Sequence, residues 1–260
     1  MVRHPYDTDL TLDQWELLRP LLPKAKSGGR PRRVNLLAVV NAIFYLLRSG
    51  CPWRLIPHDF PAWQTVYTYF RQWEADGTWE RLNRALREKL RIQAGRHRHP
   101  SAACVDSQSV KTAGAAQEKG FDGGKKVKGR KRTILVDTMG LLIGATVHSA
   151  RRSDHQGMIL LGLWFSAFWQ SIQLIWTDQT FGGQAFTAWF QKTFGWTMEV
   201  VKRPEEQQGF EVLPRRWVVE RTFAWFGHYR RLSKDYEYLP TTSEMMLYAA
   251  MVNLMLKRLA

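Results

Sequence analysis

The chain has 260 residues, of which 45% are hydrophobic, and it carries a formal net charge of +15. This apolar share supports a packed core and excludes wholesale disorder, and the length suits one large domain or a main domain with a smaller companion. The basic excess favours a polyanionic partner, with nucleic acid ahead of a membrane surface.

Neither a secreted nor a membrane-spanning protein fits the sequence. The N-terminus holds no apolar run for a signal peptide, and the most apolar stretch, residues 158–169, is shorter than the roughly 18 residues that a membrane span needs. The two cysteines, Cys51 and Cys104, form neither a disulfide framework nor a zinc motif, which fits a reducing cytosol. We therefore expect a cytoplasmic protein with no membrane partner.

The first hundred residues predict four helices separated by breakers. Thr11 can cap the first helix, which has leucines at helical spacing and stops at Pro23. The second helix covers residues 35–48, the third starts near Ala62, and the fourth runs over about 79–93.

A basic loop, residues 27–33, separates the first two of these helices, and the third helix has an apolar face and a polar, basic back. Short helices of this kind can form a helix-turn-helix-like module that binds DNA. The alternative is a helical subdomain whose polar faces only meet water. The basic loop and the net charge favour DNA binding, so we expect an all-helical DNA-binding domain over residues 1–95.

A second domain, residues 96–260, is expected beyond the basic, aperiodic segment 94–100, because three strands in succession are followed there by alternating helices and strands. This order suggests an α/β domain (α+β for the whole chain), with a mixed sheet flanked by helices. A capping box at residues 241–244 is expected to open a last helix, whose methionines we interpret as core. The predicted strands cover residues 102–107, 133–136, 141–148, 172–177 and 197–201, and the predicted helices about 155–169, 184–193 and 216–226.

Three acidic residues stand where acidic residues are costly. Asp106 and Asp178 each end an apolar strand, and Glu220 lies inside an aromatic helix. Burial of a carboxylate is unfavourable unless it is paired or binds a metal ion. Adjacent strand ends would bring the two aspartates together, and a flanking helix could add the glutamate. Hard divalent cations such as Mg²⁺ or Mn²⁺ are the natural complement of such a cluster.

Each acid also has a purely structural interpretation. An aspartate after a strand is often a turn or a helix cap, which explains Asp137, and Arg216 or Arg221 could neutralise Glu220. The three acids together, in this order and in a strongly basic chain, favour the functional interpretation.

The segments VDSQSVK (105–111) and RWVVERTFAW (216–225) resemble motifs of the transposases of the IS5 group within the DDE superfamily, and the likeness extends over essentially the whole chain. The most specific part surrounds the third acid. The matching segments are residues 51–54 (CPWR), 63–73, 105–111 (VDSQSVK), 128–132 (KGRKR), 135–141 (LVDTMGL), 216–225 (RWVVERTFAW) and 229–237 (YRRLSKDYE).

The resemblance implies an RNase H-like catalytic domain in which Asp106, Asp178 and Glu220 are the catalytic and metal-binding residues, at intervals of 178 − 106 = 72 and 220 − 178 = 42 residues. It implies a bacterial, nucleoid-associated enzyme that acts on the ends of an insertion sequence and on target DNA, as a homodimer or higher oligomer. Two Mg²⁺ or Mn²⁺ ions about 3.5 to 4 Å apart would activate water and stabilise the leaving 3′ oxygen, and the freed 3′-hydroxyl would attack the target.

The sequence departs from this group's pattern at three places. Asp178 is followed by Gln-Thr-Phe-Gly rather than by a glycine and an aromatic residue. Leu213 stands where a tyrosine is common, and Gly227 stands where a lysine or arginine is expected, with His228 and Arg230 nearby.

Basic and polar residues in four regions are candidate DNA contacts, because Lys and Arg bind phosphates and polar side chains reach base edges. These regions are the basic loop, the third helix, the glycine-rich stretch between the first two strands, and the surroundings of Glu220. A solvated flexible loop is the alternative for the glycine-rich stretch. The candidates are Arg30, Arg32, Arg33, Gln64, Thr68, Arg71, Gln72, Lys111, Lys125, Lys126, Lys128, Arg130, Lys131, Arg132, Arg216, Arg230 and Arg231.

Two other functions compete with that of a transposase. A tyrosine recombinase would need residues such as His228, Arg231 and Tyr236, which here crowd into one segment. A non-catalytic helix-turn-helix regulator would explain the helices and the charge but not the three acids. Metal dependence separates the three, because a tyrosine recombinase works in the presence of chelator and a regulator never nicks DNA.

Overall fold

The computed structural model describes residues 4–25, 28, 32–201 and 216–260. Two residues that the sequence analysis singled out, Arg30 and Leu213, therefore lie outside the described residues. Among the helices that the structure describes, none is both long and apolar enough to cross a membrane.

The four helices predicted for the N-terminal part are confirmed. Thr11 caps the first through a capping box with Gln14, and the side chain of Asn35 accepts hydrogen bonds from the first turn of the second. Gly50 ends the second helix with a left-handed conformation that favours glycine. The helices are α1 (Leu12–Leu18), α2 (Leu36–Ser49), α3 (Trp63–Ala75) and α4 (Thr78–Gln93).

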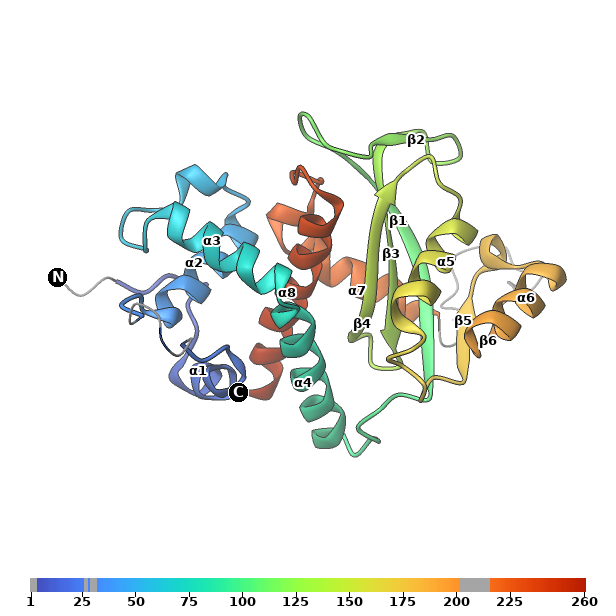
Figure 1. The fold of residues 1–260 in the computed structure, drawn as a ribbon, viewed down its shortest axis with the longest axis horizontal. Helices are drawn as coiled ribbons and strands as arrows, with labels where there is room; N and C mark the ends of the chain where they lie inside the picture. The colour runs from blue at the N-terminus through green and yellow to red at the C-terminus, as the bar shows by residue number, and fades with distance from the viewer. Residues whose placement is uncertain (1–3, 26–27, 29–31, 202–215) are drawn as a thin grey trace.

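A mixed sheet forms the second half of the molecule (Figure 1). Strand β3 lies between β4 and β1, and all pairings among these three are antiparallel. The next strands, β5 and β6, run parallel to β1. The short β2 pairs with the outer end of β3. The strands are β1 (Ala102–Lys111), β2 (Gly120–Asp122), β3 (Val127–Asp137), β4 (Leu142–Ser149), β5 (Leu174–Thr177) and β6 (Thr197–Val200).

Helices cover both faces of this sheet, because the side chains of each strand alternate between two apolar clusters. One cluster joins the sheet to α5 (Asp154–Phe165) and α6 (Gln184–Phe194). The other joins it to α7 (Trp217–Gly227) and α8 (Pro240–Leu259), as Figure 1 shows. The prediction of a mixed sheet flanked by helices and preceded by a helical region is confirmed.

The apolar cluster on the α8 side of the sheet continues into the N-terminal helices, so α8 belongs to a core that both halves of the chain share. Its methionines are buried, as expected. A buried ion pair, Arg91 Nη1 to Asp137 Oδ2 at 2.7 Å, also crosses the expected boundary near residue 95. Asp137 accepts hydrogen bonds from the backbone of Met139 and Leu141, which confirms the turn. The division into residues 1–95 and 96–260 stays a prediction.

Two local predictions are corrected. The strand expected at 133–136 begins at Val127, so the basic residues before it belong to β3 rather than to a loop. The capping box expected at 241–244 does not form, because the last helix begins at Pro240, and Glu244 instead accepts a hydrogen bond from the backbone of Val147 at 2.7 Å. Proline at a first helical position is favourable because its fixed φ suits the helix.

Candidate active site

Asp106 and Asp178 lie side by side at the edge where β1 and β5 part. The parallel register pairs Ala102 with Leu174 and ends with Cys104 opposite Trp176. Each aspartate stands two residues beyond this last pair, so the interval of 72 residues in the sequence equals the offset of the strand register. The expectation that Asp106 ends its strand is wrong, because β1 continues to Lys111 through its pairing with β3. The two aspartates nevertheless come together, since β1 and β5 stop pairing just before them.

Glu220 faces the same place from the first turn of α7. One guanidinium nitrogen of Arg216, Nη2, lies 3.8 Å from Asp178 Oδ2 and 3.8 Å from Glu220 Oε1. Arg216 is buried, whereas Glu220 is half-exposed. Arg216 therefore links the strand acid to the helix acid, and its Nε has no hydrogen-bond partner among the described residues. Because α7 begins here, the positive end of the helix dipole also faces the acids.

Burial raises the pKa of Asp106 to about 6, and the nearby carboxylate of Asp178 adds to the effect. A hydrogen bond from the backbone of Ser107 and the charges of Arg216 and Lys125 act in the opposite direction. Lys125 comes from the glycine-rich stretch, and its Nζ donates to the carbonyl of Ser107 at 3.0 Å. Its place beside Asp106 was not predicted, because no local pattern links the two segments.

The chemistry of this donor set fits a hard divalent cation. Two aspartates and a glutamate offer only oxygen ligands, and like-charged neighbours favour a cation between them. Asp178 also accepts hydrogen bonds from Thr180 through its other oxygen, which orients its carboxylate. Within the described ranges, no three acidic, histidine or cysteine side chains converge closely enough to share one ion.

The turn between β3 and β4 holds α7 in place. Arg221 donates to the carbonyl of Met139 at 2.9 Å, and Thr222 donates to the carbonyl of Gly140 at 2.8 Å. A Cβ at Gly140 would lie 2.9 Å from Thr222 Oγ1 and 3.0 Å from the ring of Trp225. The glycine therefore permits the close contact that sets the position of the helix carrying Glu220.

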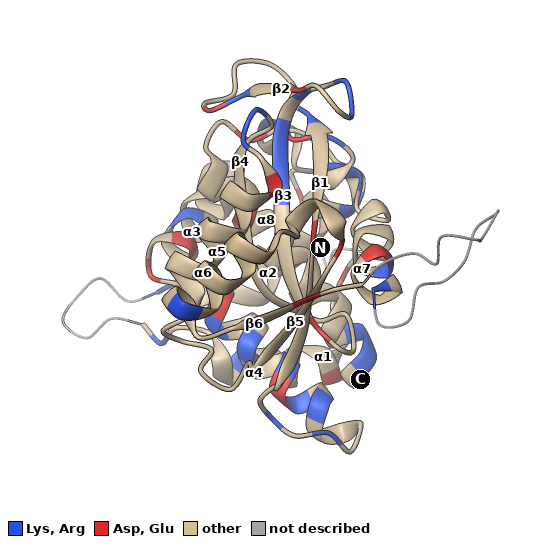
Figure 2. Cartoon of the chain, turned by 90° about the vertical axis from the view of Figure 1, so that its right-hand side faces the viewer, with Lys and Arg blue, Asp and Glu red and all other residues tan. Residues whose placement is uncertain are grey.

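The exposed candidates for DNA contact gather at the β2 end of the sheet, where Figure 2 shows Lys and Arg around β2 and along β3. Lys125 and Lys126 lie in the turn between β2 and β3, and Lys128 follows at the start of β3. Lys111 ends β1, and Arg230 is exposed beyond α7. A group of exposed cations of this kind suits a phosphate backbone.

Four further candidates are buried in ion pairs and hydrogen bonds. Arg130 lies 3.2 Å from Asp235, and Arg132 donates to the carbonyls of Leu232 and Lys234. Lys131 pairs with Asp154 at 3.0 Å, and Arg231 pairs with Glu237 at 2.7 Å. The alternative of a solvated flexible loop does not hold for residues 130–132, which belong to β3. Arg130 and Arg132 anchor the segment after α7 to this strand. We withdraw these four residues as DNA contacts.

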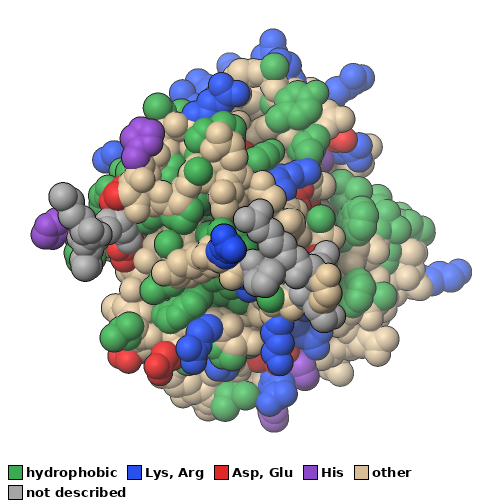
Figure 3. Space-filling model, turned by 60° about the vertical axis from the view of Figure 1, so that its left-hand side comes forward, with side chains coloured by type: hydrophobic (Ala, Val, Ile, Leu, Met, Phe, Trp, Pro, Cys, Tyr) green, Lys and Arg blue, Asp and Glu red, His purple; other side chains and the backbone are tan. Residues whose placement is uncertain are grey.

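Several candidates for DNA contact in the N-terminal part are exposed to solvent. On α3, Gln64, Thr68 and Gln72 are exposed. Arg71 instead contacts Glu74 and Thr242, each at 2.7 Å, and so ties α3 to α8. Arg33 is exposed. Figure 3 shows Lys and Arg interspersed with apolar side chains on the side of the molecule that carries these helices.

In the basic loop, Arg32 donates to the carbonyl of Pro23 at 3.0 Å.

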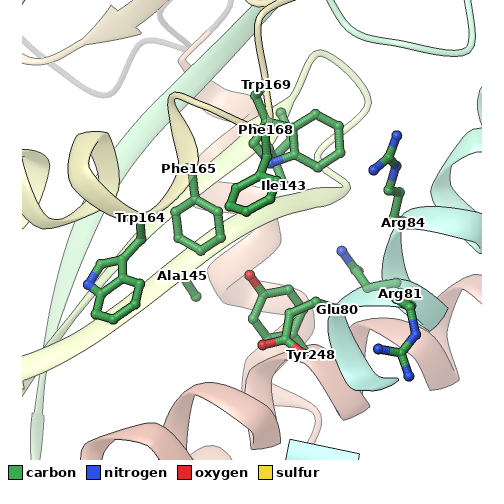
Figure 4. A pocket seen from close by; sticks show the side chains of 11 residues that line it. Glu80, Arg81, Arg84, Ile143, Ala145, Trp164, Phe165, Phe168, Trp169 and Tyr248 are labelled. Carbon is green, nitrogen blue, oxygen red and sulfur yellow. The ribbon is translucent and has the colours of Figure 1, made fainter. Parts of the chain in front are cut away.

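The three acids do not line the apolar cavity of about 400 Å³ between α4, α5 and β4. Trp164 and Phe168 border this cavity, and Tyr248 lies at its floor (Figure 4). An open edge with carboxylates, rather than an enclosed pocket, suits a long polymer as the substrate.

A mixed sheet with one carboxylate inside β1 and another directly after β5 forms an acidic site that suits a hard divalent cation. The family profile described as a transposase DDE domain matches residues 97–255, and a second profile, described as a putative transposase of the IS4/5 family, matches residues 10–83. The chain belongs to the family of transposases with a DDE domain. This membership confirms the resemblance found in the sequence and leaves no support for a tyrosine recombinase or a non-catalytic regulator.

One of the curated relatives is a protein of an insertion element. An insertion element IS402 uncharacterized 16.2 kDa protein of Burkholderia cepacia is 36% identical over 112 residues, which cover 41% of this chain and 75% of the relative. The uncharacterized protein y4sN of Sinorhizobium fredii is 26% identical over 81 residues, covering 31% and 65%. Among solved structures, a pre-cleavage Mos1 transpososome matches at 11% identity with a TM-score of 0.30, covering 91% of this chain and 80% of that chain.

Proposed function

We propose that this transposase cuts and rejoins DNA at an acidic site made of Asp106, Asp178 and Glu220. The observation that carries the proposal is the strand register, which sets the two aspartates side by side. Transposases with a DDE domain generally use a divalent metal, and the oxygen donors here suit Mg²⁺ or Mn²⁺. Two such ions would supply activation of water and stabilisation of the leaving 3′ oxygen.

The chain's own residues prepare the site for that chemistry. Asp106 and Asp178 provide carboxylate oxygens from neighbouring positions of one sheet, because Asp106 lies inside β1 and Asp178 directly follows the adjacent β5. Glu220 approaches from α7, whose position depends on the turn at Gly140. Arg216 neutralises Asp178 and Glu220 while no cation is bound, so the carboxylates remain close despite their like charges.

Double-stranded DNA is the proposed partner, at both the element ends and the target. The exposed residues of α3, namely Gln64, Thr68 and Gln72, are suited to base edges, whereas the lysines near β2 bind phosphates without reading sequence. We propose that the helical residues 1–95 recognise the ends and that a homodimer or higher oligomer assembles on them.

Nicking of supercoiled plasmid in Mg²⁺ tests the proposal. Asp106→Asn, Asp178→Asn and Glu220→Gln should each lose at least about 100-fold in cleavage rate, because each removes a charged ligand of the ion. Binding of the same DNA in the absence of divalent metal should stay within a few-fold of wild type. Asp13→Asn, on exposed α1, is the matched control and should cleave normally. Full cleavage by all three variants would overturn the assignment of the site.

A further inference from the structure

A second hollow of about 580 Å³ lies between α3 and the segment that precedes α8. We propose that this cleft holds an unstacked nucleobase of the bound DNA; the inference rests on the proposed function in that it takes DNA as the substrate. Its volume falls within the range of ligand-binding clefts in proteins. Its lining combines aromatic side chains with arginines, namely Trp53, Arg54, Trp63, Tyr67, Arg231, Tyr236 and Tyr238.

Three tyrosines leave part of their rings open to a ligand. Tyr67 and Tyr236 are each 37% exposed and Tyr238 is 64% exposed, although all three line the cleft. A base can stack on such rings whatever its identity, because every base has a π-face. Partly exposed aromatic rings along a concave site offer a surface on which a flat, aromatic ligand can stack.

Arginine side chains lie against aromatic rings at both ends of the cleft. The guanidinium of Arg54 lies 5.4 Å from the ring centre of Trp63, and that of Arg231 lies 5.3 Å from the ring centre of Tyr236. Arg231 is buried and paired with Glu237, whereas Arg54 is exposed. The charge of Arg54 beside a stacking surface favours a ligand that carries phosphate as well as a base. A neutral apolar ligand would make no use of this charge.

Fixed partners keep the wall of the cleft in one arrangement. Arg231 pairs with Glu237 at 2.7 Å and donates to the carbonyl of Cys51 at 3.0 Å, so the segment before α8 is tied to the segment before α3. Trp53 packs edge-on against Tyr67, with ring centres 5.1 Å apart. A site built in advance in this way loses little conformational entropy when it binds.

The cleft also lies between the two surfaces proposed to contact DNA. Tyr67 is on α3 next to the exposed Thr68, and Trp63 precedes the exposed Gln64. On the other side, the backbone N–H of Gln117 donates to the carbonyl of Tyr238 at 2.9 Å, which ties this wall to the segment that leads into β2. Figure 1 shows the start of α8 between α3 and the β2 end of the sheet. A DNA strand that spans both surfaces would pass over the cleft.

The cavity in Figure 4 provides an internal comparison. It also has exposed aromatic residues, with Trp164 at 66%, but its rim does not lie between the two proposed DNA-binding surfaces. If any exposed aromatic group could bind the base, variants at the cleft and at this cavity would lose base binding to the same extent. We expect only the cleft beside α3 to take the base.

The test measures binding of the full-length chain to oligothymidine that carries one 2-aminopurine, and to the same strand in a duplex. Stacking quenches 2-aminopurine, so wild type should quench the single-stranded probe. The variant Tyr67→Leu combined with Tyr236→Leu should abolish quenching and weaken single-strand binding about ten-fold, since each stacked base contributes substantially to affinity. Duplex binding should remain within about two-fold. Tyr67→Phe with Tyr236→Phe should restore quenching because the rings return.

The control variant is Trp164→Leu, which should quench as wild type does. Equal single-strand binding and quenching by wild type and the leucine variant would overturn the inference, as would an equal loss for single-stranded and duplex DNA. If the thermal unfolding of the leucine variant differs from that of wild type, the variant Tyr67→Phe with Tyr236→Phe replaces it in the test. Loss of 2-aminopurine quenching in that phenylalanine variant also overturns the inference. Plasmid nicking is a separate readout. Quenching without nicking contradicts only the proposed function, whereas nicking without quenching contradicts only the base site.

Discussion

Gly140 and Trp225 fit together without room for a side chain between them. Gly140 has a φ of +80°, and an added Cβ would lie 3.0 Å from the indole of Trp225. The turn between β3 and β4 and the helix that carries Glu220 therefore share one close contact. This contact makes the position of a candidate catalytic acid depend on a glycine distant in the sequence.

Gly140→Ala should reduce DNA cleavage more than it reduces stability or DNA binding. The positive φ costs about 1 kcal/mol for alanine, and the contact with Trp225 shifts α7 in addition. Cleavage rates of the purified variant, set against its urea unfolding curve, measure the two effects. Gly195→Ala is the matched control, because Gly195 has a φ of +78° and open space around its Cβ position. If both variants cleave equally well, α7 is not positioned by this contact.

Arg130→Met should destabilise the fold by about 3 to 5 kcal/mol, because it leaves Asp235 buried without its charged partner. The double variant with Asp235→Leu should recover part of that loss, since no isolated charge then remains buried. Urea unfolding of both variants measures the difference. Lys128→Met, one strand position away from the buried run and exposed, should change stability by less than about 0.5 kcal/mol. A small effect of Arg130→Met would contradict the structural role that we assign to this residue.

Stability should fall as the pH rises from about 5 to 8, in part because of Glu244. Burial raises the pKa of this carboxyl to about 8, and the acids Glu80, Glu74 and Glu118 add to the effect. The folded chain thus holds a proton that the unfolded chain releases near its ordinary pKa, so the contribution is complete below that value and is lost as pH approaches 8.

Glu244→Gln should flatten this dependence by roughly 1 to 3 kcal/mol across the interval, because the amide keeps an oxygen for the backbone of Val147 and has no proton to lose. Unfolding midpoints at several pH values provide the measurement. Glu16→Gln, on the surface of α1, serves as the comparison. An unchanged pH dependence in Glu244→Gln would mean that this carboxyl is ionised in the folded protein.

The sequence predicted the elements whose pattern is local. Thr11 and Asn35 mark helix starts by their capping chemistry, and the apolar strands before Asp106 and Asp178 follow from composition and length. The number of residues between those aspartates could not be interpreted from the sequence alone. It became informative only when the β1–β5 register showed the same offset.

Long-range pairing explains the predictions that failed. The sequence analysis proposed residues 130–132 as DNA contacts, yet Arg130 is buried and pairs with Asp235, which lies far along the chain. The predicted capping box is absent for a similar reason, since Glu244 accepts a hydrogen bond from the backbone of β4 and not from the first turn of its own helix. Neither partner can be recognised from the neighbouring sequence, because the contacts arise only when the sheet and α8 pack together.

Glu220→Gln should lose cleavage while keeping the fold, because its side chain is half-exposed and its partner Arg216 can still contact Asp178. We expect an unfolding free energy within about 0.5 kcal/mol of wild type and a cleavage rate reduced at least about 100-fold. Glu118→Gln removes a comparable exposed pair, with Arg152 at 3.9 Å, and should leave the rate unchanged. Plasmid nicking and urea unfolding of the two variants decide the matter. Equal rates would remove Glu220 from the site.

Binding of Mn²⁺ to the DNA-free chain, followed by electron paramagnetic resonance, tests the central claim most directly. Asp106 and Asp178 share one strand register, and oxygen ligands at that spacing suit a divalent ion. We predict that wild type and Asp13→Asn bind Mn²⁺ alike, and that Asp106→Asn and Asp178→Asn each weaken binding at least about ten-fold while melting as wild type does. Unchanged Mn²⁺ affinity in both aspartate variants would contradict the account.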